Sequence, residues 1–430
     1  MWNVKWMNNY ALRITQCLAF AFALFLAGCG DFFTPVDSTP APTEYSYNYW
    51  LLQRTYLYED ELPLLDENGD SVTELYATLQ DPFTRYVPPS KSEATITHIN
   101  TSVVPGDVGM EYALYPQQEH PLVINRVYDQ GPAGRAGIPR YGTILNVNGV
   151  EIVGENAFDT YDSVLTYSKE VAIRVATAGD TTLFEISKED VYAPTVFIDT
   201  LVDETIVITV TGFKLTTVDK ENGTLGELKD YLDSTRNIAR PRLLDLRNNP
   251  GGHVNHCTAM ADLFIEKGTI TTESWRALDA DGNSEHRKKN IVASPGDAGE
   301  GKNFVVLVNK GSASCAEIFT AAIAEGANIP VAGTNTYGKG IGQSTWNTKA
   351  GGLAIITNLE FLTPRGNSYN KKGIAPDYPC ESASLACGLE AIRHYYGQDA
   401  LAKKNSFNVE EKTRRRYRFD GGAFADGKKL

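Results

Sequence analysis

The spacing of hydrophobic positions changes along the chain, and each pattern predicts a different kind of structure. From Tyr45 to Tyr86, apolar side chains recur at helical spacing, most clearly at Tyr49, Leu52, Tyr56, Leu75 and Leu79. Asp81-Pro82 would end the second helix, because a residue before proline disfavours the helical conformation. We therefore predict an N-terminal helical region over residues 45–95, which serves packing.

Residues 96–190 have short apolar runs that are separated by Gly, Pro and Asn. Four of these runs are typical of β-strands: Leu122–Ile124, Ile144–Val147, Ala172–Val175 and Leu183–Ile186. A segment of Gly, Pro and Ala, Gly131–Ile138, separates the first two, and Asn148-Gly149 has the composition of a tight turn. This pattern predicts a small β-domain.

From Val191 to about residue 400, strand-like and helix-like runs alternate. The expected strands are Ile206–Val210, Leu243–Leu246 and Phe304–Val308. The expected helices are Leu225–Leu232, Thr258–Phe264 and Cys315–Gly326. Alternation of this kind implies a layered α/β core.

The N-terminus has the features of an export signal. Lys5 and Arg13 precede an apolar run, Ile14–Gly28, that is too short to span a bilayer comfortably. The run ends in Leu26-Ala27-Gly28-Cys29, which resembles the lipobox of bacterial lipoproteins. The resemblance implies a signal peptide over residues 1–28 and a lipid on Cys29. A plain secretory signal with an incidental cysteine, or a buried helix, is the alternative.

Two further segments flank the expected domains. Residues 29–44 are rich in Pro, Asp, Ser and Thr, which predicts a flexible tether. Residues 401–430 form a C-terminal tail with a basic run that is interpreted as solvated surface.

Length, charge and cysteines narrow the classes of function. A chain of 430 residues is too long for one ordinary core. The net charge of −13 argues against nucleic acid as the main partner, because phosphate binding needs clustered Lys and Arg. Cys17 would leave with the signal. Cys380 and Cys387 could pair in an oxidising compartment, although spacing alone leaves that pairing open, and no C-x-x-C metal pattern is present.

The strongest chemical candidate is Ser314, where a buried strand, a turn of small residues and a helix follow each other. Ligands gather at the carboxyl ends of strands in α/β sheets. A hydroxyl at a helix N-terminus also lies among unpaired N–H groups that favour negative charge. This placement suits a nucleophile. The alternative is purely structural, since Ser314 and Glu317 have the spacing of a capping box.

A serine nucleophile needs a base, because its hydroxyl barely ionises at neutral pH. The candidate is Lys339, which lies between Gly338 and Gly340, and these glycines would let the backbone approach another segment closely. Burial of a lysine disfavours its cation and so makes the amine a better base. The alternative is a solvated lysine in a turn.

The two segments together resemble the S41 family of carboxyl-terminal processing peptidases. In that family the nucleophile precedes the lysine by 25 positions, and a glutamine follows four positions later, as Ser314, Lys339 and Gln343 do here. The resemblance implies a Ser-Lys dyad with Gln343 orienting the lysine. It also implies an oxyanion hole from the backbone N–H groups of Gly251 or Gly252 and of Cys315.

Other segments match the family in the same order: Leu62-Pro63, Asp81–Tyr86, Leu244–Gly252, Thr363–Gly366 and Gly373–Asp377. Cys315 and Ala316 depart from the family's usual Ala and Ser. The thiol of Cys315 is expected to be a small buried packing group, with a redox-sensitive thiol as the alternative, and its N–H can still serve an oxyanion hole. The base must be uncharged, so activity should rise with pH.

The β-domain resembles a bacterial PDZ domain, with Thr143 departing from the acid usual at its position. The resemblance implies a carboxylate-binding loop for a peptide C-terminus, formed by Val108, Gly109, Met110 and Glu111. An unrelated small β-domain is the alternative. The fold class expected is multidomain α/β: the helical region, the PDZ-like domain over 96–190 and a crotonase/ClpP-like peptidase core over 191–400.

The expected function is therefore a serine endopeptidase that is lipid-anchored in the bacterial cell envelope, on the periplasmic side or at the outer membrane. Its partners would be protein or peptide C-terminal segments and the membrane, with a homodimer left open and no cofactor or metal. His253 and His256 could bind zinc but lack a clear third ligand, and His256 is a weaker base candidate than Lys339. A non-catalytic peptide-binding lipoprotein on a peptidase fold is the main rival, ahead of a crotonase-type acyl-CoA enzyme.

Overall fold

The computed structural model describes residues 43–201, 205–235, 240–279, 282–295 and 303–397. The predicted signal peptide, Cys29, nearly all of the tether and the tail over 401–430 lie outside the described residues. The chain has a mixed α/β structure. None of the described helices combines the length and the apolar character needed to cross a membrane.

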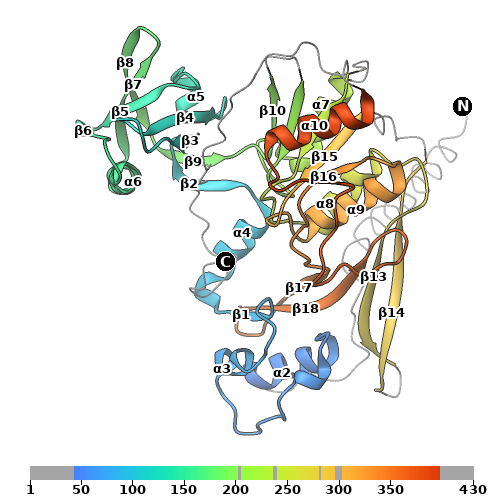
Figure 1. Cartoon of the computed structure of the whole chain (residues 1–430). Helices are drawn as coiled ribbons and strands as arrows, with labels where there is room; N and C mark the ends of the chain where they lie inside the picture. The colour runs from blue at the N-terminus through green and yellow to red at the C-terminus, as the bar shows by residue number, and fades with distance from the viewer. Residues whose placement is uncertain (1–42, 202–204, 236–239, 280–281, 296–302, 398–430) are drawn as a thin grey trace, which may run out of the picture.

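The core contains a six-stranded sheet, and Ser314 follows its strand β15 (Phe304–Val308; Figure 1). Its order is β10 (Val196–Thr200), β11 (Ile206–Val210), β12 (Arg242–Asp245), β15 (Phe304–Val308), β16 (Val331–Gly333) and β19 (Tyr378–Pro379). The β10–β11 pair is antiparallel and the other neighbours are parallel. The strands predicted at Ile206–Val210 and Phe304–Val308 are confirmed.

Helices cover both faces of this sheet, because alternate side chains of a strand point to opposite faces. Leu244 and Val306 belong to the cluster that packs against α7 (Gly223–Ser234), α8 (Val254–Asp262) and α9 (Cys315–Ala327). Leu243 and Val305 pack instead with α10 (Leu385–Tyr396). The helix expected from Thr258 begins earlier, at Val254, after the N-cap residue His253. The layered α/β core is confirmed.

The sequence patterns did not predict the second sheet. It contains β1 (Arg85–Val87), β18 (Leu353–Leu362), β13 (Thr269–Leu278), β14 (Ser284–Val292) and β17 (Ile341–Asn347). β13 and β14 form a long hairpin (Figure 1). Most side chains of β14 are exposed, and charged residues occupy its centre, so the apolar alternation that identifies a strand is missing.

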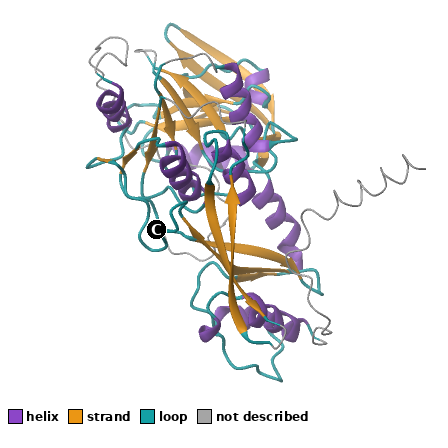
Figure 2. Ribbon diagram, turned by 90° about the vertical axis from the view of Figure 1, so that its right-hand side faces the viewer, coloured by secondary structure: helices purple, strands orange, loops and turns teal. Residues whose placement is uncertain are grey.

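The N-terminal helices pack on this second sheet. α2 (Glu44–Thr55) and α3 (Val72–Ala77) share a core with Ala354 and Ile356 of β18. A short turn of helix, η1 (Glu59–Glu61), connects them. Figure 2 shows these helices at the end of the crossed strands that lies furthest from the α/β core. α3 already ends at Ala77, and α4 (Pro89–Asn100) runs past the boundary predicted at residue 95.

A separate β-rich unit follows α4 and forms its own lobe (Figure 1). Its six-stranded sheet contains β3 (Met110–Leu114), β4 (Leu122–Val127), β5 (Thr143–Val147), β6 (Val150–Glu151), β7 (Glu170–Thr177) and β8 (Asp180–Ser187). The unit also has α5 (Pro132–Arg135) and α6 (Ala157–Thr166), while β2 (Val103–Asp107) pairs with β9 (Glu189–Tyr192). Its buried side chains form a cluster distinct from that of the α/β core.

The pairing of Cys380 with Cys387, which the sequence left open, is present as a disulfide. It joins the end of β19 to the first turn of α10.

Candidate active site

Ser314 lies in a strained turn between β15 and α9. It is the N-cap residue of α9, with φ +56° and ψ −119°. A positive φ is uncommon for any residue other than glycine, and such strain clusters at functional sites. In several hydrolases a similar strand-to-helix turn exposes the nucleophilic hydroxyl. The backbone conformation therefore favours a chemical role for Ser314 over capping alone.

Hydrogen bonds hold this turn on two sides. The Ala313 N–H donates to the Asn249 carbonyl at 2.9 Å, which fixes the turn to the loop after β12. The Tyr337 N–H donates to the Ser312 carbonyl at 2.9 Å, which fixes it to the loop that carries Lys339. The turn is therefore held by hydrogen bonds to the loop after β12 and to the loop that carries Lys339.

The carboxylate of Glu317 joins the serine turn to the lysine loop. Its Oε2 accepts the backbone N–H groups of Ser314 (2.9 Å) and Lys339 (2.7 Å). Its Oε1 accepts the Gly338 N–H at 2.7 Å and the Thr336 hydroxyl at 2.5 Å. Because two backbone nitrogens donate to one oxygen atom, Ser314 and Lys339 must be close neighbours in space.

Glu317 is fully buried, and all four of its partners are donors. Four donors and no acceptor suit an ionised carboxylate. Burial raises the pKa of Glu317, while hydrogen bonds from Thr336, Gly338, Lys339 and Ser314 act in the opposite direction. The capping role predicted from its spacing is only one part of what Glu317 does.

Lys339 lies in surroundings that favour the neutral amine. Burial lowers its pKa to about 8, against smaller opposing effects of Asp81 and Glu317. The Nζ atom donates to Gln343 Oε1 at 3.0 Å and lies 4.2 Å from the ring centroid of Phe83. A pKa near 8 leaves a useful fraction of neutral base near neutral pH.

The glycines beside Lys339 allow close approach to a neighbouring loop, as expected. A Cβ atom on Gly338 would lie 2.9 Å from the backbone nitrogen of Gly373, and one on Gly340 would lie 2.9 Å from that of Asn370. Gly338 also has φ +92°. Larger residues at either position would push the lysine loop away from the loop at 370–373.

A chain of hydrogen bonds supports Gln343 from the N-terminal region. Gln343 Nε2 donates to Thr357 Oγ1 at 2.9 Å, and the Thr357 N–H donates to Thr84 Oγ1 at 2.9 Å. The Thr84 hydroxyl in turn donates to Asp81 Oδ2 at 2.6 Å. The segment Asp81–Thr84 therefore forms one wall of the lysine site.

The structure separates the two glycines that were considered for the oxyanion hole. The Gly251 N–H donates to Asn249 Oδ1 at 2.9 Å, so it is already occupied. Among the described residues, no acceptor is found for the N–H groups of Gly252 and Cys315. The Gly251 position nevertheless lies against the nucleophile, because a Cβ there would be 2.9 Å from both Cys315 N and Ser314 Cβ. Gly252 and Cys315 thus keep N–H groups that are available as donors, and the oxyanion hole stays a prediction.

Ser314 and Lys339 are neighbours, but their reactive atoms are not hydrogen-bonded to each other. Within the described part of the chain, Lys339 Nζ donates to Gln343 and has no bond to Ser314 Oγ. Catalytic hydrogen bonds are often long before substrate binds and tighten in the reacting complex.

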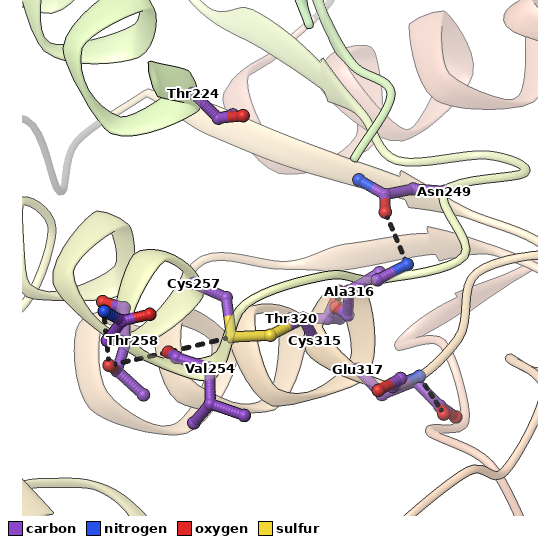
Figure 3. The surroundings of a disulfide bond; sticks show 12 residues. Thr224, Asn249, Val254, Cys257, Thr258, Cys315, Ala316, Glu317 and Thr320 are labelled. Atoms are coloured by element: carbon purple, nitrogen blue, oxygen red, sulfur yellow. Dashed lines mark hydrogen bonds between the residues drawn. A yellow bond between two sulfur atoms is a disulfide. The ribbon is translucent and has the colours of Figure 1, made fainter. Parts of the chain in front are cut away.

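Cys315 is not the unpaired packing residue that the sequence suggested. It forms a disulfide with Cys257 of α8 (Figure 3). The two cysteines are 58 positions apart, and no local signal in the sequence connects them. The expected burial is confirmed, because both cysteines are fully buried, and the expectation of an unpaired thiol is wrong, because the sulfur of Cys315 is bonded to that of Cys257.

The residues of the expected carboxylate-binding loop lie at one edge of the β-rich sheet. Val108 is buried, and the Gly109 N–H donates to Asp107 Oδ1 at 2.6 Å. Met110 and Glu111 begin β3, which ends the strand order of that sheet. Glu111 accepts hydrogen bonds from Arg126 (3.2 Å) and the Tyr128 hydroxyl (2.7 Å).

His253 and His256 lie near the start of α8. His253 Nε2 is 3.0 Å from Asn100 Oδ1, and burial lowers the pKa of His253 to about 4. Across the described ranges, no group of three or more His, Cys, Asp or Glu side chains has the geometry to hold a metal ion.

Sequence reasoning missed four parts of the site: Asp81, Phe83, Thr357 and Cys257. The segment Asp81–Tyr86 had matched the family, but the match gave no role for its side chains. The positions of Asp81, Phe83 and Thr357 at the lysine site depend on the second sheet, which the sequence patterns did not reveal, whereas Cys257 was missed because its partner is 58 positions away.

The sequence model of peptidase family S41 matches residues 205–380, which include every residue of the candidate site except Asp81–Thr84. A probable CtpA-like serine protease of Staphylococcus aureus (strain MRSA252) is 30% identical over 321 residues, covering 72% of this chain and 60% of that protein. A protein of the same description from Staphylococcus saprophyticus is 30% identical over 307 residues, covering 70% and 58%. The chain thus spans about three fifths of the length of the curated relatives it matches.

Solved structures are similar over most of the chain. A crystal structure assigned to the S41 proteases, from Bacteroides fragilis, aligns with a TM-score of 0.58 and 13% identity, covering 84% of this chain and 99% of that one. The photosystem II D1 C-terminal processing protease aligns with a TM-score of 0.47 and 23% identity, covering 83% and 97%. The first of these similarities concerns the fold alone.

Proposed function

Because the chain belongs to peptidase family S41, we propose that it is a serine endopeptidase in which Lys339 is the base for Ser314. One observation carries the proposal: the strained Ser314 and the low-pKa Lys339 both donate their backbone N–H groups to a single carboxylate oxygen of Glu317. A scaffold protein has no need for this combination of strain, burial and a shared anchor.

The reaction would begin with neutral Lys339 taking the proton of Ser314 as its Oγ atom attacks a peptide carbonyl. The tetrahedral oxyanion would receive hydrogen bonds from the N–H groups of Gly252 and Cys315. The lysine ammonium would then protonate the leaving amine, and water would hydrolyse the acyl-enzyme. Gln343 would keep one amine hydrogen occupied, so that the lone pair points toward the serine.

The substrates we propose are proteins, selected or sensed through their C-terminal segments by a PDZ-like domain. β3 lies at the edge of its sheet, where an extended peptide can add a strand. The loop formed by Val108, Gly109, Met110 and Glu111 would then face the terminal carboxylate of that peptide.

We also propose that a lipid on Cys29 anchors the protein in the bacterial cell envelope. Metabolic labelling with an alkyne fatty acid, compared between wild type and Cys29→Ala, tests the anchor. A homodimer stays a prediction that light scattering can test.

A decisive experiment compares labelling and turnover in matched variants. Wild type should react with a fluorophosphonate probe and degrade an unfolded, quenched-fluorescent casein. Ser314→Ala and Lys339→Ala should do neither, while Lys349→Ala, which removes an exposed lysine, should match wild type. Equal turnover in wild type and Lys339→Ala would rule out the lysine as base. Absence of both signals in wild type would favour the non-catalytic peptide-binding alternative.

A further inference from the structure

The Cys257–Cys315 disulfide joins two helices at the ends that face the candidate site. Cys315 is the first residue of α9, directly after Ser314, and Cys257 is in the first turns of α8. Their Cα atoms are 5.7 Å apart. Figure 3 shows the bond between Cys257 and Cys315, next to Val254, with Glu317 further along α9.

Both segments carry a candidate donor of the oxyanion hole. The Cys315 N–H belongs to the disulfide-bonded residue itself, and Gly252 lies five residues before Cys257, in the loop that leads into α8. The two segments are otherwise joined near the site by hydrogen bonds, such as that of the Ala313 N–H to the Asn249 carbonyl. The disulfide is therefore the covalent link between the two halves of the hole.

We propose that the Cys257–Cys315 disulfide is a positioning element of the reaction, which fixes the Gly252 and Cys315 N–H groups at the separation that an oxyanion requires. This inference rests on the proposed peptidase function. The two sulfurs lie in the packed core with no exposed surface. Two thiols need more room than a bonded pair, so reduction must shift α8 against α9 in an interior without spare space.

Reduction of the Cys257–Cys315 disulfide by a dithiol is a two-electron exchange. A dithiol reductant transfers two electrons and two protons to the sulfurs, the S–S bond breaks to give two thiols, and the reductant closes to its own disulfide. Hydrolytic activity would then follow the oxidation state of this bond, which suits an enzyme of an oxidising compartment.

The test compares two double variants. Cys257→Ala with Cys315→Ala removes the bond beside the site, and Cys380→Ala with Cys387→Ala removes the other disulfide of the described chain as a matched control. Active sites are titrated with the fluorophosphonate, and kcat, KM, the pH midpoint and the melting temperature are measured with the casein substrate.

The expected result is a fall in kcat per titrated site of about 10- to 100-fold for the first variant, because a misplaced oxyanion donor is partly lost. Its KM and pH midpoint should stay unchanged, since the lysine is untouched. The control should keep the wild-type kcat. A purely stabilising disulfide would instead lower the melting temperature and leave kcat per titrated site at the wild-type value, and that outcome overturns the proposal.

Reduction of wild type gives a second route if the first variant does not fold. Dithiothreitol should lower kcat by the same factor, in step with the appearance of the Cys257 and Cys315 thiols by mass spectrometry, and reoxidation should restore it. Thiols that appear without loss of kcat overturn the inference alone. An oxidised wild type that neither labels at Ser314 nor turns over refutes the proposed function and this inference with it.

Discussion

The Glu317 carboxylate permits a sharp prediction, because each of its oxygens has two assigned donors. In Glu317→Gln one oxygen becomes an NH₂ group, which can no longer accept. If the NH₂ faced Ser314 and Lys339, two backbone N–H groups would lose their acceptor. If it faces Thr336 instead, that hydroxyl can accept from it, since it already accepts the Ile374 N–H at 2.6 Å and has a second lone pair. The second orientation should therefore be favoured, and it leaves two donors without their acceptor, the Gly338 N–H and the hydroxyl hydrogen of Thr336.

The magnitudes follow from counting these donors. One buried donor without a partner costs about 1–3 kcal/mol, so Glu317→Gln, which leaves two, should lose about 2–6 kcal/mol of free energy of unfolding. Glu317→Ala leaves three backbone N–H groups and the Thr336 hydroxyl without an acceptor, which costs about 4–12 kcal/mol and approaches the total stability of a typical domain, about 5–15 kcal/mol. The glutamine variant should fold, and the alanine variant should be unfolded or nearly so.

The same variant has a second, independent readout. The charge of Glu317 favours the Lys339 ammonium and so raises its pKa. Removing that charge should lower the lysine pKa further, and the pH midpoint of kcat should move below the wild-type value of about 8. Because the amide oxygen still holds both Ser314 and Lys339, kcat/KM should fall by no more than about tenfold, or about 1.4 kcal/mol.

Urea unfolding and pH–rate profiles measure these two effects. Thr336→Val serves as the partner in a double-mutant cycle, since it removes the acceptor that the new NH₂ group needs. The double variant should be less stable than the sum of the single changes by about 1 kcal/mol or more. Equal destabilisation in Glu317→Gln and Glu317→Ala, or a midpoint that moves upward, would refute the reasoning.

Three further predictions concern the neighbouring residues. Wild-type activity should rise with pH as Lys339 loses its proton, with a midpoint of about 8. At pH 7 it should be about one tenth of its maximum. A flat profile of casein turnover between pH 6 and 9.5 would contradict a lysine base. Phe83→Leu keeps an apolar wall but removes the ring near Nζ, so the midpoint should fall by about half a unit, whereas Phe83→Ala admits water and should raise it. Gly251→Ala would place a Cβ 2.9 Å from Cys315 N on a backbone with φ +100°, so kcat should fall by about 100-fold or more. The control Gly282→Ala has a similar φ, +84°, with open space around the position, so it should lose stability and keep the wild-type kcat.

Much of the α/β core, and the candidates for the reacting pair, could be predicted from short stretches of sequence. The buried strand Phe304–Val308, the small residues after it and the helix from Cys315 identify a turn where a nucleophile can lie. Lys339 and Gln343 are four positions apart, and their side chains do meet through a hydrogen bond. Flanking glycines correctly indicated a close backbone approach at the lysine loop.

The second sheet and its consequences could not be predicted in the same way. β14 has charged residues where an ordinary strand alternates, and α4 crosses a boundary that was placed by a change of composition. Because the second sheet was missed, so was the wall of the lysine site. Phe83 reaches Lys339 from more than 250 positions away, and only the pairing of β1 with β18 brings that segment there.

The sequence by itself identified the candidates for the chemistry: a serine at a helix start, a lysine between glycines and a glutamine four positions later. Periodicity predicted the strand and the helix around the serine, because it reports on a single element, while the pairing of serine and lysine came from the spacing shared with the S41 family. Tertiary structure alone decided the surroundings: the shared carboxylate of Glu317, the aromatic wall of Phe83, the hydrogen bond that occupies the Gly251 N–H and the bond between Cys257 and Cys315. These depend on how distant segments pack, and burial, which lowers the lysine pKa, is a property of that packing and of no single segment.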